Sequence, residues 1–467
     1  MSLSRFSVIV AIDANAGISK KGILPWQSRS DMSFFREMTV GKGNNKNVII
    51  MGRKTYESLP EESKPLKDRV NIVISKRWDQ GEYPDITIYK TLLDCLNGIG
   101  QKHVVYDDVF IIGGEILYKE TVDDYMHLCD RVYVTKFKTN YECDKFFPFD
   151  KVKHFPQVKA ATNTVDYTRY FFKPDVIHPE YLYLDLLREL KEHGEPRKDR
   201  TGTGTLSKFG HMITIDISTK FPLMTTKELK FEMIAKEMLW MVSGSTNCKA
   251  LEELGVNVWK DNTSREFLDA KGLTNLGDGD MGPGYGHQWR YWGAEYVDMW
   301  TDYEGKGFDQ LSTLIKQIKK DPTSRRHILN AWNAGEIDKM ALPPCHMMCQ
   351  FYVSNDNNHL DCQLYLRSSD TFLGLPWNIA GYALLIYMIA YLCKLKPRKL
   401  NIVFGDAHLY KNHIESVEKQ LKRTPRSLPT LTIKADGPIK HIDDFKLEHF
   451  ILTGYSPCPY LAGKMSI

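Results

Sequence analysis

The sequence lacks any large excess of charge of one sign. Its 62 basic and 58 acidic residues leave a formal net charge of +4. Proteins that coat nucleic acids or lie on membrane surfaces usually carry a strong basic excess, so this balance supports neither class. The sequence also has no internal repeat and no low-complexity tract. With 42% hydrophobic and 26% charged residues, it has the composition of an ordinary soluble globular protein.

Long hydrophobic runs are scarce too. The best candidate for a membrane span, "WNIAGYALLIYMIAYLC" at residues 377–393, falls short of the roughly 20 apolar residues that a span needs. It contains Asn378 and follows Pro376, so we expect a buried core or interface helix and no membrane association. At the N-terminus, "MSLSRFSVIVAID" has an apolar run too short for a signal peptide, and Asp13 interrupts it.

Paired cysteine motifs are missing as well. The nine cysteines are an odd number scattered through the chain. Disulfide frameworks and zinc knuckles need regular spacing, so both classes lose support. We therefore expect reduced thiols, a cytoplasmic location and no bound metal.

The length of 467 residues exceeds what one hydrophobic core usually serves and predicts two domains. The first third of the chain contains continuous apolar runs, typical of strands buried on both faces of a mostly parallel α/β sheet flanked by helices. These runs lie at residues 6–12, 47–51, 70–75 and 108–114, with closing strands at 131–137 and 166–172. The stretch "KPDVIHPE" has two prolines and no apolar periodicity. We place the first domain at 1–172, a short junction at 173–178 and the second domain at 179–467.

The second domain opens with a pattern typical of an amphipathic helix. In "EYLYLDLLRELKEHGE", Leu182, Leu186, Leu187 and Leu190 share one face, and Gly194 caps the end. Mixed strands and helices follow, with residues 377–393 as the expected central helix.

Asp31 lies in "QSRSDMSFFREM", a predicted helix whose apolar residues Met32, Phe35 and Met38 are expected to point inward. A lone carboxylate there could be a surface or N-cap residue. It could also be a carboxylate in an apolar pocket, with a pKa raised by burial, that pairs with a nitrogen-rich ring. Spacing alone leaves both interpretations open.

Glycines and cations follow the predicted strands of the first domain. In "FIIGGEILYKE" a strand runs into Gly113 and Gly114 and then into a helix, which would let the backbone approach a phosphate. "GRKT" and "SKR" place cations at strand ends, where ligands of open sheets gather. A phosphorylated cofactor would suit this edge.

A second glycine pattern does not indicate a dinucleotide site. Gly277, Gly279 and Gly282 spell G-x-G-x-x-G, but no strand precedes them, and Pro283 and Gly284 follow in place of a helix. We expect a loop.

Cys345 in "MALPPCHMMCQFYV" has three possible roles. It could be a packing residue, a zinc ligand with His346 and Cys349, or a nucleophile. A nucleophilic thiolate needs cations around it, and converging guanidinium groups would also bind a phosphate. The candidate arginines are Arg200, Arg325, Arg326 and Arg367, whose convergence spacing cannot establish.

Residues 1 to about 172 resemble the dihydrofolate reductase family through "GISKKGILPW", Asp31, "GRKT", "PLKDR", "SKR", "IIGGEILY" and "VYVTKF". The resemblance implies that Asp31 holds the pterin ring and assists protonation of N5, while NADPH gives a hydride to C6. The implied folate residues are Asp31, Met32, Phe35, Thr55, Ser58, Leu59, Arg69 and Thr135. The implied NADPH residues are Ala11, Gly17, Ile18, Gly22, Arg53, Lys54, Thr55, Ser75, Lys76, Arg77, Gly113, Gly114, Glu115, Ile116 and Tyr118.

Residues from about 178 to 467 resemble the thymidylate synthase family, an α+β fold, through "RTGTGT", "FPLMTTK", "ALPPCH", "LYLRSSD", "GLPWNIAGYALL" and "GDAHLY". The resemblance implies that Cys345 attacks C6 of dUMP, that Glu237 and Tyr285 transfer protons, and that 5,10-methylenetetrahydrofolate is the cosubstrate. His346 becomes a hydrogen-bonding neighbour. The implied dUMP residues are Arg200, Arg325, Arg326, Arg367, Ser368, Asp370, Asn378, His408 and Tyr410, and the implied folate residues are Trp259, Asn262 and Asp370.

The resemblance also implies a homodimer formed through the second domain, in which Arg325 and Arg326 act on the neighbouring subunit's site. Joining the two halves would let one chain make thymidylate and reduce the dihydrofolate that this leaves. Leu366 and Gly381 depart from the synthase pattern, where a glutamine and a serine are common. Two alternatives compete: a synthase half that acts as a hydroxymethylase or on dCMP, and an inactive half that serves as a scaffold or nucleic-acid-binding module.

Overall fold

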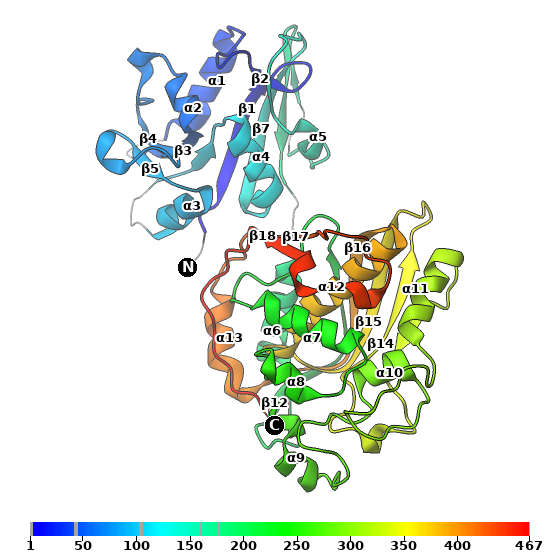
Figure 1. Ribbon diagram of the computed structural model, residues 1–467. Coiled ribbons are helices and arrows are strands. Elements are labelled where there is room, and N and C mark those ends of the chain that lie inside the picture. The colour runs from blue at the N-terminus through cyan, green and yellow to red at the C-terminus, as the bar shows by residue number, and fades with distance from the viewer. Residues whose placement is uncertain (1–2, 42–44, 102–105, 159–160, 175–177, 467) are drawn as a thin grey trace. The chain divides into compact units, whose positions relative to one another are not determined.

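The computed structural model describes residues 3–41, 45–101, 106–158, 161–174 and 178–466. The chain divides into two compact units, Met1–His178 and Pro179–Ile467, which are described separately (Figure 1). The expected junction at 173–178 falls at this division, and its residues 175–177 lie outside the described residues.

The N-terminal unit is built on an eight-stranded sheet with the order β5-β4-β3-β6-β1-β7-β10-β9. Strands from β5 to β7 pair in parallel, and β10 pairs antiparallel with β7. The predicted mostly parallel sheet is therefore confirmed. Its strands are β1 (Phe6–Ile12), β3 (Asn47–Gly52), β4 (Arg69–Ile74), β5 (Thr87–Tyr89), β6 (Val109–Ile111), β7 (Cys129–Phe137), β9 (Thr162–Asn163) and β10 (Tyr167–Phe172).

The other elements of this unit cover the sheet or close its edge. The helices are α1 (Arg29–Thr39), α2 (Arg53–Glu57), α3 (Leu92–Gln101), α4 (Glu115–Asp124) and α5 (Phe149–Val152). The short strands β2 (Gly17–Ser19) and β8 (Lys145–Phe146) pair with each other. The carboxyl ends of β3, β4 and β6 meet at one edge, which positions the segments after them side by side.

The C-terminal unit contains a six-stranded sheet with the order β11-β12-β16-β15-β14-β13. Its strands are β11 (Glu195–Arg197), β12 (Thr205–Asp216), β13 (Ile328–Asn330), β14 (His346–Val353), β15 (His359–Asp370) and β16 (Lys396–Tyr410), and β17 (Thr430–Ile433) pairs with β18 (Phe450–Thr453). The helices are α6 (Glu180–His193), α7 (Phe231–Val242), α8 (Cys248–Glu253), α9 (Arg265–Ala270), α10 (Tyr285–Tyr291), α11 (Gln310–Lys320), α12 (Gly374–Cys393) and α13 (Ile414–Leu421).

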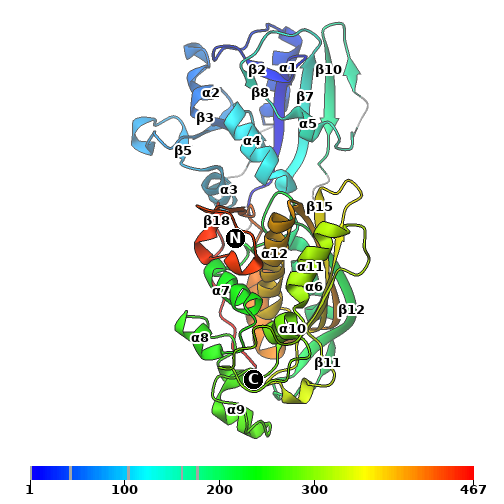
Figure 2. The same cartoon turned by 45° about the vertical axis from the view of Figure 1, so that its right-hand side comes forward.

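Helix α12 is the centre of this unit's core. It packs against α7 and against the inner face of β15 and β16, and 78% of its most apolar window is buried (Figure 2). It is the one helix in the described ranges that is long and apolar enough to cross a membrane by length and composition. Its burial makes it the core helix that the sequence predicts, although it begins three residues earlier, at Gly374.

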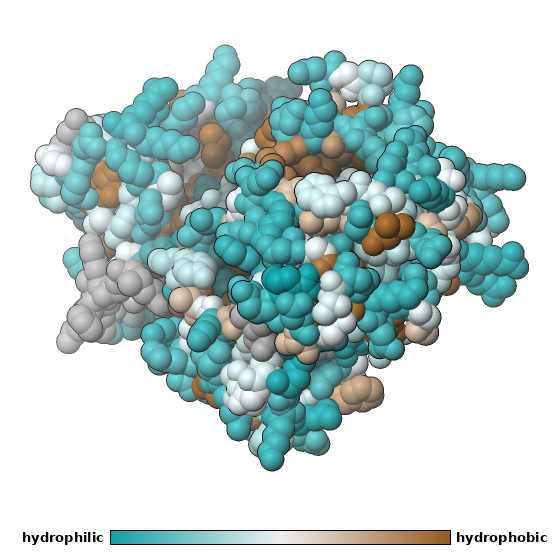
Figure 3. Space-filling model, turned by 60° about the horizontal axis from the view of Figure 1, so that its bottom comes forward, coloured by the Kyte–Doolittle hydropathy of each residue, from teal (hydrophilic) through white to brown (hydrophobic). Residues whose placement is uncertain are grey.

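The opposite face of the six-stranded sheet carries apolar side chains that face away from α12. Met348, Tyr365, Val403 and Met212 stand directly opposite one another on β14, β15, β16 and β12, and so form a row across four strands. Met348 is 37% exposed and Met212 59%. We call these four residues the outer row. On the face drawn in Figure 3, hydrophilic side chains predominate.

The glycine-rich segment 277–284 is a loop that bears no dinucleotide-type strand-helix turn, as predicted. However, α10 begins at Tyr285 directly after it, so the expectation that no helix follows is wrong. The aromatic residues Tyr285 and Trp289 lie one turn apart and are both 1% exposed, and their burial on one face stabilises this short helix.

Replacing Gly381 by alanine should stabilise this unit. Gly381 lies inside α12, where a Cβ would meet only Met238 Cε at 3.4 Å and Ile234 Cγ2 at 3.8 Å. Alanine gains about 1 kcal/mol over glycine in a helix interior, so we expect a higher free energy of unfolding in urea. As a control, Gly282→Ala should destabilise the unit, because Gly282 has φ +72 and its Cβ would lie 2.3 Å from Lys339 O. A lower free energy of unfolding for Gly381→Ala would contradict the prediction.

Candidate active sites

Asp31 lies in the first turn of α1 and is 6% exposed. Its backbone N–H donates to Ser28 Oγ at 3.3 Å, so Ser28 is the N-cap and Asp31 is not. Burial raises the pKa of Asp31, while a hydrogen bond from the Thr135 side chain and the charge of Arg169 lower it. Asp31 is therefore a buried carboxylate with a raised pKa, as in the second of the two interpretations given above. The Thr135 side chain and the charge of Arg169 act on it.

A cavity of about 410 Å³ borders Asp31. Its lining residues come from the loop before α1 and from the start of the helix: Leu24, Trp26, Gln27, Ser28, Arg29, Asp31 and Met32. Met32 is 55% exposed, so the expectation that it points inward is wrong. It faces this open cavity, whereas Phe35 and Met38 pack against the sheet core.

The glycines at the carboxyl ends of β3 and β6 lie against each other. Gly52 N donates to Gly113 O at 2.7 Å. A Cβ on Gly114 would lie 3.0 Å from Thr55 Oγ1, and a Cβ on Gly113 would lie 2.8 Å from the Tyr118 ring. Gly114 is also the N-cap of α4 and has no side chain to cap it, so the first N–H groups of this ten-residue helix face the sheet edge.

The expected cations lie at the same edge, after β3 and β4. Lys54, Lys76 and Arg77 are exposed, while Arg53 is paired with Glu57 at 2.5 Å. Ser75 is buried, and its Oγ accepts from Arg77 N at 3.2 Å, which fixes the turn that carries Lys76. The structure therefore brings the four basic side chains to one edge.

Other expected residues of this unit occupy several environments. Phe35 and Leu59 pack against one apolar cluster, and the Arg69 guanidinium lies 5.9 Å from the Phe35 ring. Arg69 Nη1 donates to Thr39 Oγ1 at 2.9 Å. Ala11 lies on β1, Gly17 and Ile18 lie on β2, and Gly22 lies in the turn after β2. Ser58 is exposed, and Ile116 is 80% exposed. Glu115 accepts a hydrogen bond from Phe146 N, and Tyr118 donates one to Ile9 O.

Cys345 lies directly before β14, between the Pro343–Pro344 pair and His346. Its backbone N–H donates to the Tyr285 hydroxyl at 2.9 Å, and its carbonyl accepts from Arg367 N at 2.9 Å. Arg367 Nη2 lies 3.9 Å from the sulfur. Arg367 also donates to the carbonyls of Pro344 and Pro343, at 2.8 and 2.7 Å, and so holds the loop that presents the thiol.

Two arginines of the same chain act electrostatically on the Cys345 thiol. Burial raises the pKa of Cys345, and the charges of Arg367 and Arg200 lower it, with burial the larger effect. Arg325 and Arg326 instead lie exposed between α11 and β13. Within the single chain, two of the four candidate arginines therefore act on Cys345.

The zinc interpretation of this segment does not fit its side chains. His346 Nδ1 is 2.8 Å from the Tyr382 hydroxyl, and burial lowers its pKa to about 3. Cys349 is 1% exposed in the core. Across the described ranges of the chain, no three His, Cys, Asp or Glu side chains form a group that could hold a metal ion. None of the nine cysteines, all of which lie in the described ranges, forms a disulfide.

Glu237 is a buried carboxyl on α7 that two tryptophans share. Trp259 Nε1 donates to one carboxyl oxygen at 2.7 Å, and Trp377 Nε1 donates to the other. Burial raises the pKa of Glu237 to about 7, against these two donors. A carboxyl with this pKa can both give and accept a proton near neutral pH.

The carboxyl ends of β15 and β16 carry the remaining expected residues. Asp370 and His408 stand opposite each other, and Asp370 Oδ1 accepts from Phe372 N and Leu373 N at 2.9 and 3.2 Å. Burial raises the pKa of Tyr410 to about 12, and Asp370, Arg200 and Cys345 act on it electrostatically. Ser368 lies on β15 opposite Asp406, and Asn378 lies in the first turns of α12.

Asn262 is 7% exposed, and its Nδ2 has no hydrogen-bond partner among the described residues. A buried unpaired amide is costly and indicates a missing polar partner such as a ligand. Leu366, which departs from the synthase pattern, is fully buried in the core.

Comparisons with known proteins account for both units. A dihydrofolate reductase model matches residues 5–173, and a thymidylate synthase model matches residues 181–467. The bifunctional dihydrofolate reductase-thymidylate synthase of Zea mays is 38% identical over 99% of this chain and 97% of its own length. The chain belongs to the bifunctional dihydrofolate reductase–thymidylate synthase family. The enzyme of the same name from Daucus carota is 39% identical over 99% of this chain and 96% of its own, and that from Paramecium tetraurelia is 38% identical over 99% of both.

Both enzyme activities follow from this membership: reduction of dihydrofolate in the N-terminal unit, now the reductase domain, and synthesis of dTMP in the C-terminal unit, the synthase domain. The substrates of these families are dUMP and folates, and the families use NADPH and methylenetetrahydrofolate. These matches do not favour the hydroxymethylase and scaffold alternatives.

Two residues of these sites were not identified from the sequence. In the reductase domain, Arg169 Nη2 lies 3.9 Å from Asp31 Oδ1. In the synthase domain, Trp377 donates to Glu237, whereas the sequence predicts only a helix at this position. The available signal for Arg169 was a charge between aromatic residues in "DYTRYFF", since a cation in a half-buried strand needs a partner.

Proposed function

We propose that Cys345 is the nucleophile that forms a bond to C6 of dUMP, with Arg200 and Arg367 beside the bound phosphate. The observation that supports this most directly is that the charges of both guanidinium groups act on one thiol and oppose the rise in its pKa that burial causes. Attack at C6 makes C5 of the uracil nucleophilic. The proton that later leaves C5 passes to Glu237 through water, which suits a carboxyl with a pKa of about 7.

Methylenetetrahydrofolate supplies both the one-carbon unit and the hydride in this reaction. We assign its binding to Trp259, Asn262 and Asp370. The orphaned Nδ2 of Asn262 supports the assignment, because a folate oxygen would give it a partner. Asn378, His408 and Tyr410 would bind the base and ribose of dUMP.

In the reductase domain, we assign Asp31 to the pterin ring and the glycine edge to NADPH. Asp31 would hold the ring nitrogens and assist protonation of N5. NADPH supplies the hydride when bound. The fit rests on Gly114, where a Cβ would lie 3.0 Å from Thr55 Oγ1, and on the uncapped start of α4 beside four basic residues. Arg69 would bind the glutamate tail of folate.

We further infer a homodimer that joins the outer rows of two synthase domains. An apolar row across four strands is unusual for a free surface, and a second copy could cover it through a two-fold axis. Arg325 and Arg326 precede β13, whose Ile328 stands opposite Gln350 on the same sheet, so they lie at the border of this face. The partner's Arg325 and the partner's Arg326 would then place two further positive charges near each Cys345.

Mixing two inactive variants tests this arrangement. Cys345→Ala and Arg326→Glu proteins, each with little synthase activity, should regain activity after subunit exchange. Half of the dimers in an equal mixture are hybrids with one intact site, so we expect about a quarter of the wild-type rate of tritium release from 5-labelled dUMP. The matched control mixes Cys345→Ala with Arg200→Glu. It should regain nothing, because both residues serve the site of their own chain. Equal behaviour of the two mixtures, with exchange demonstrated, would remove the shared site.

A further inference from the structure

Arg169 reaches the buried acid of the reductase domain from strand β10. Its Nη2 lies 3.9 Å from Asp31 Oδ1, and the two side chains are 11% and 9% exposed. This Nη2 has no hydrogen-bond partner within the described part of the chain. A buried guanidinium is costly, so its position beside a second buried charge needs an explanation.

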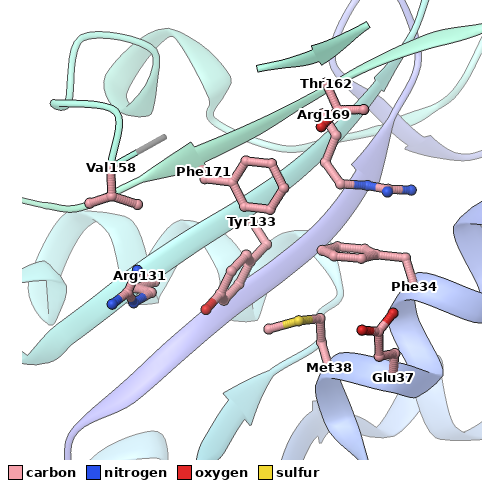
Figure 4. A pocket seen from close by; sticks show the side chains of 9 residues that line it. All are labelled: Phe34, Glu37, Met38, Arg131, Tyr133, Val158, Thr162, Arg169 and Phe171. Carbon is pink, nitrogen blue, oxygen red and sulfur yellow. The ribbon is translucent and has the colours of Figure 1, made fainter. Parts of the chain in front are cut away.

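Aromatic rings hold the Arg169 side chain in this position. Its guanidinium carbon lies 3.9 Å from the centre of the Phe34 ring and 4.9 Å from that of Tyr167. Figure 4 shows the guanidinium extended over Phe34, with Arg169 coming from β10 and Phe34 from α1. Because the rings restrict its rotamers, the cation stays directed at Asp31.

Arg169 also sets the direction of the Thr135 hydroxyl. Arg169 Nε donates to Thr135 Oγ1 at 3.2 Å, and the Thr135 side chain is hydrogen-bonded to Asp31. A hydroxyl has one hydrogen to donate. Since its oxygen already accepts from Nε, its hydrogen is free to point at the carboxylate. Arg169 therefore acts on Asp31 by charge and through Thr135.

Arg169 approaches Asp31 from a different side than a ligand would. Asp31 borders the 410 Å³ cavity. Arg169 lines a second cavity of about 430 Å³ with Phe34, Tyr133, Phe171 and other residues (Figure 4). A substrate in the first cavity would meet Asp31 and would not need to touch Arg169.

The elements packed against Asp31 present few other charges to it. On α1 itself, Arg29, Arg36 and Glu37 are exposed. Strand β3 presents the apolar sequence "NVIIM", and β7 contributes the Thr135 hydroxyl. Among the charged groups of the described residues, Arg169 alone acts on the pKa of Asp31.

We propose that Arg169 is a positioning residue of the reductase reaction, which holds the Asp31 carboxylate charged and oriented by its own charge and through Thr135. The proposal rests on the role of Asp31 given under Proposed function. Arg169 touches neither the pterin nor NADPH in this account, so its effect must appear in how the reaction depends on pH.

The sign of that effect follows from the charges. Loss of the Arg169 charge raises the pKa of Asp31, by about one unit or more for a neighbouring cation. N5 of the pterin must gain a proton, so the rate falls as the pH rises through the pKa of the protonated complex. Without Arg169 this fall should move to higher pH.

The experiment measures single-turnover hydride transfer, followed by NADPH absorbance, from about pH 5 to 9. Arg169→Gln should move the midpoint up by about one pH unit or more. Arg169→Lys, which keeps the charge, should restore most of the wild-type midpoint. The control Arg131→Gln removes another arginine that lines the second cavity and should leave the midpoint unchanged.

An unchanged midpoint in Arg169→Gln, with synthase activity intact, overturns the proposal. The role of Asp31 is judged separately by Asp31→Asn: if that variant keeps full activity, the proposed function has failed and not only this inference. If Arg169→Gln does not fold, Thr135→Val takes its place. Thr135→Val removes the donor that Arg169 orients, and a wild-type midpoint for it would overturn the proposal equally.

Discussion

Cys345→Ala is expected to abolish thymidylate synthesis and to leave dihydrofolate reduction unchanged. Without the sulfur no bond to C6 can form, and loss of a nucleophile typically costs about 10⁴-fold or more in rate. The reductase domain has its own sheet and its own site around Asp31, so its rate should not respond. Tritium release from 5-labelled dUMP measures the first activity, and NADPH oxidation with dihydrofolate measures the second.

The chain provides a matched control in Cys349, four residues along the same segment. Its thiol is 1% exposed and packs in the core. Cys349→Ala should lose some stability and keep synthase activity. A covalent adduct trapped by 5-fluoro-dUMP and methylenetetrahydrofolate should map to Cys345 in the wild type and be absent from Cys345→Ala. An adduct on another residue would show that the assignment of the nucleophile is wrong.

Asp31→Asn should do the reverse and lower reductase activity by about 10²- to 10⁴-fold, the range for loss of a general acid or base. Synthase activity should stay at the wild-type level. Glu37→Gln is the matched control, because Glu37 is an exposed carboxylate on the same helix. Loss of both activities in Asp31→Asn, in a protein that is still folded, would contradict the division of labour between the domains.

The same substitution should increase stability at neutral pH. Burial raises the pKa of Asp31, so the folded state favours the protonated carboxyl. This contribution is fully present below the unfolded-state pKa and is lost as the pH rises through the folded-state pKa. Asp31→Asn does not ionise, so the reductase domain of this variant should unfold at a higher temperature than wild type near pH 7. This difference in unfolding temperature between Asp31→Asn and the wild type should disappear in acid.

The strands were predictable because burial on both faces requires continuous apolar runs. "FSVIVAI" and "NVIIMG" form β1 and β3 where their patterns indicate. The pairing of β2 with β8 was not predictable, since strands of two or three residues are too short to show a hydrophobic pattern. The family motifs predicted roles for Asp31 and Cys345 within long segments. The expectation that Met32 points inward was wrong, because a helix pattern does not distinguish the core from an open cavity.

The partners of the site residues were the least predictable part. Arg169 and Asp31 are 138 positions apart and meet only through the register of β10 on β7. Trp259 and Trp377, which both donate to Glu237, likewise come from segments that lie far apart in the sequence. Spacing alone also left open which arginines lie near Cys345, and the structure shows that Arg325 and Arg326 lie exposed beside β13.

The uncovered outer row has a consequence for the ratio of the two products. If the synthase site is shared between subunits, as proposed, and the reductase site lies within each chain, mass action affects only the synthase activity. On dilution, output of dTMP should fade as subunits separate, while tetrahydrofolate continues to form at the same rate per chain. The number of enzyme copies in a compartment would then set the balance between nucleotide supply and the pool of reduced folate.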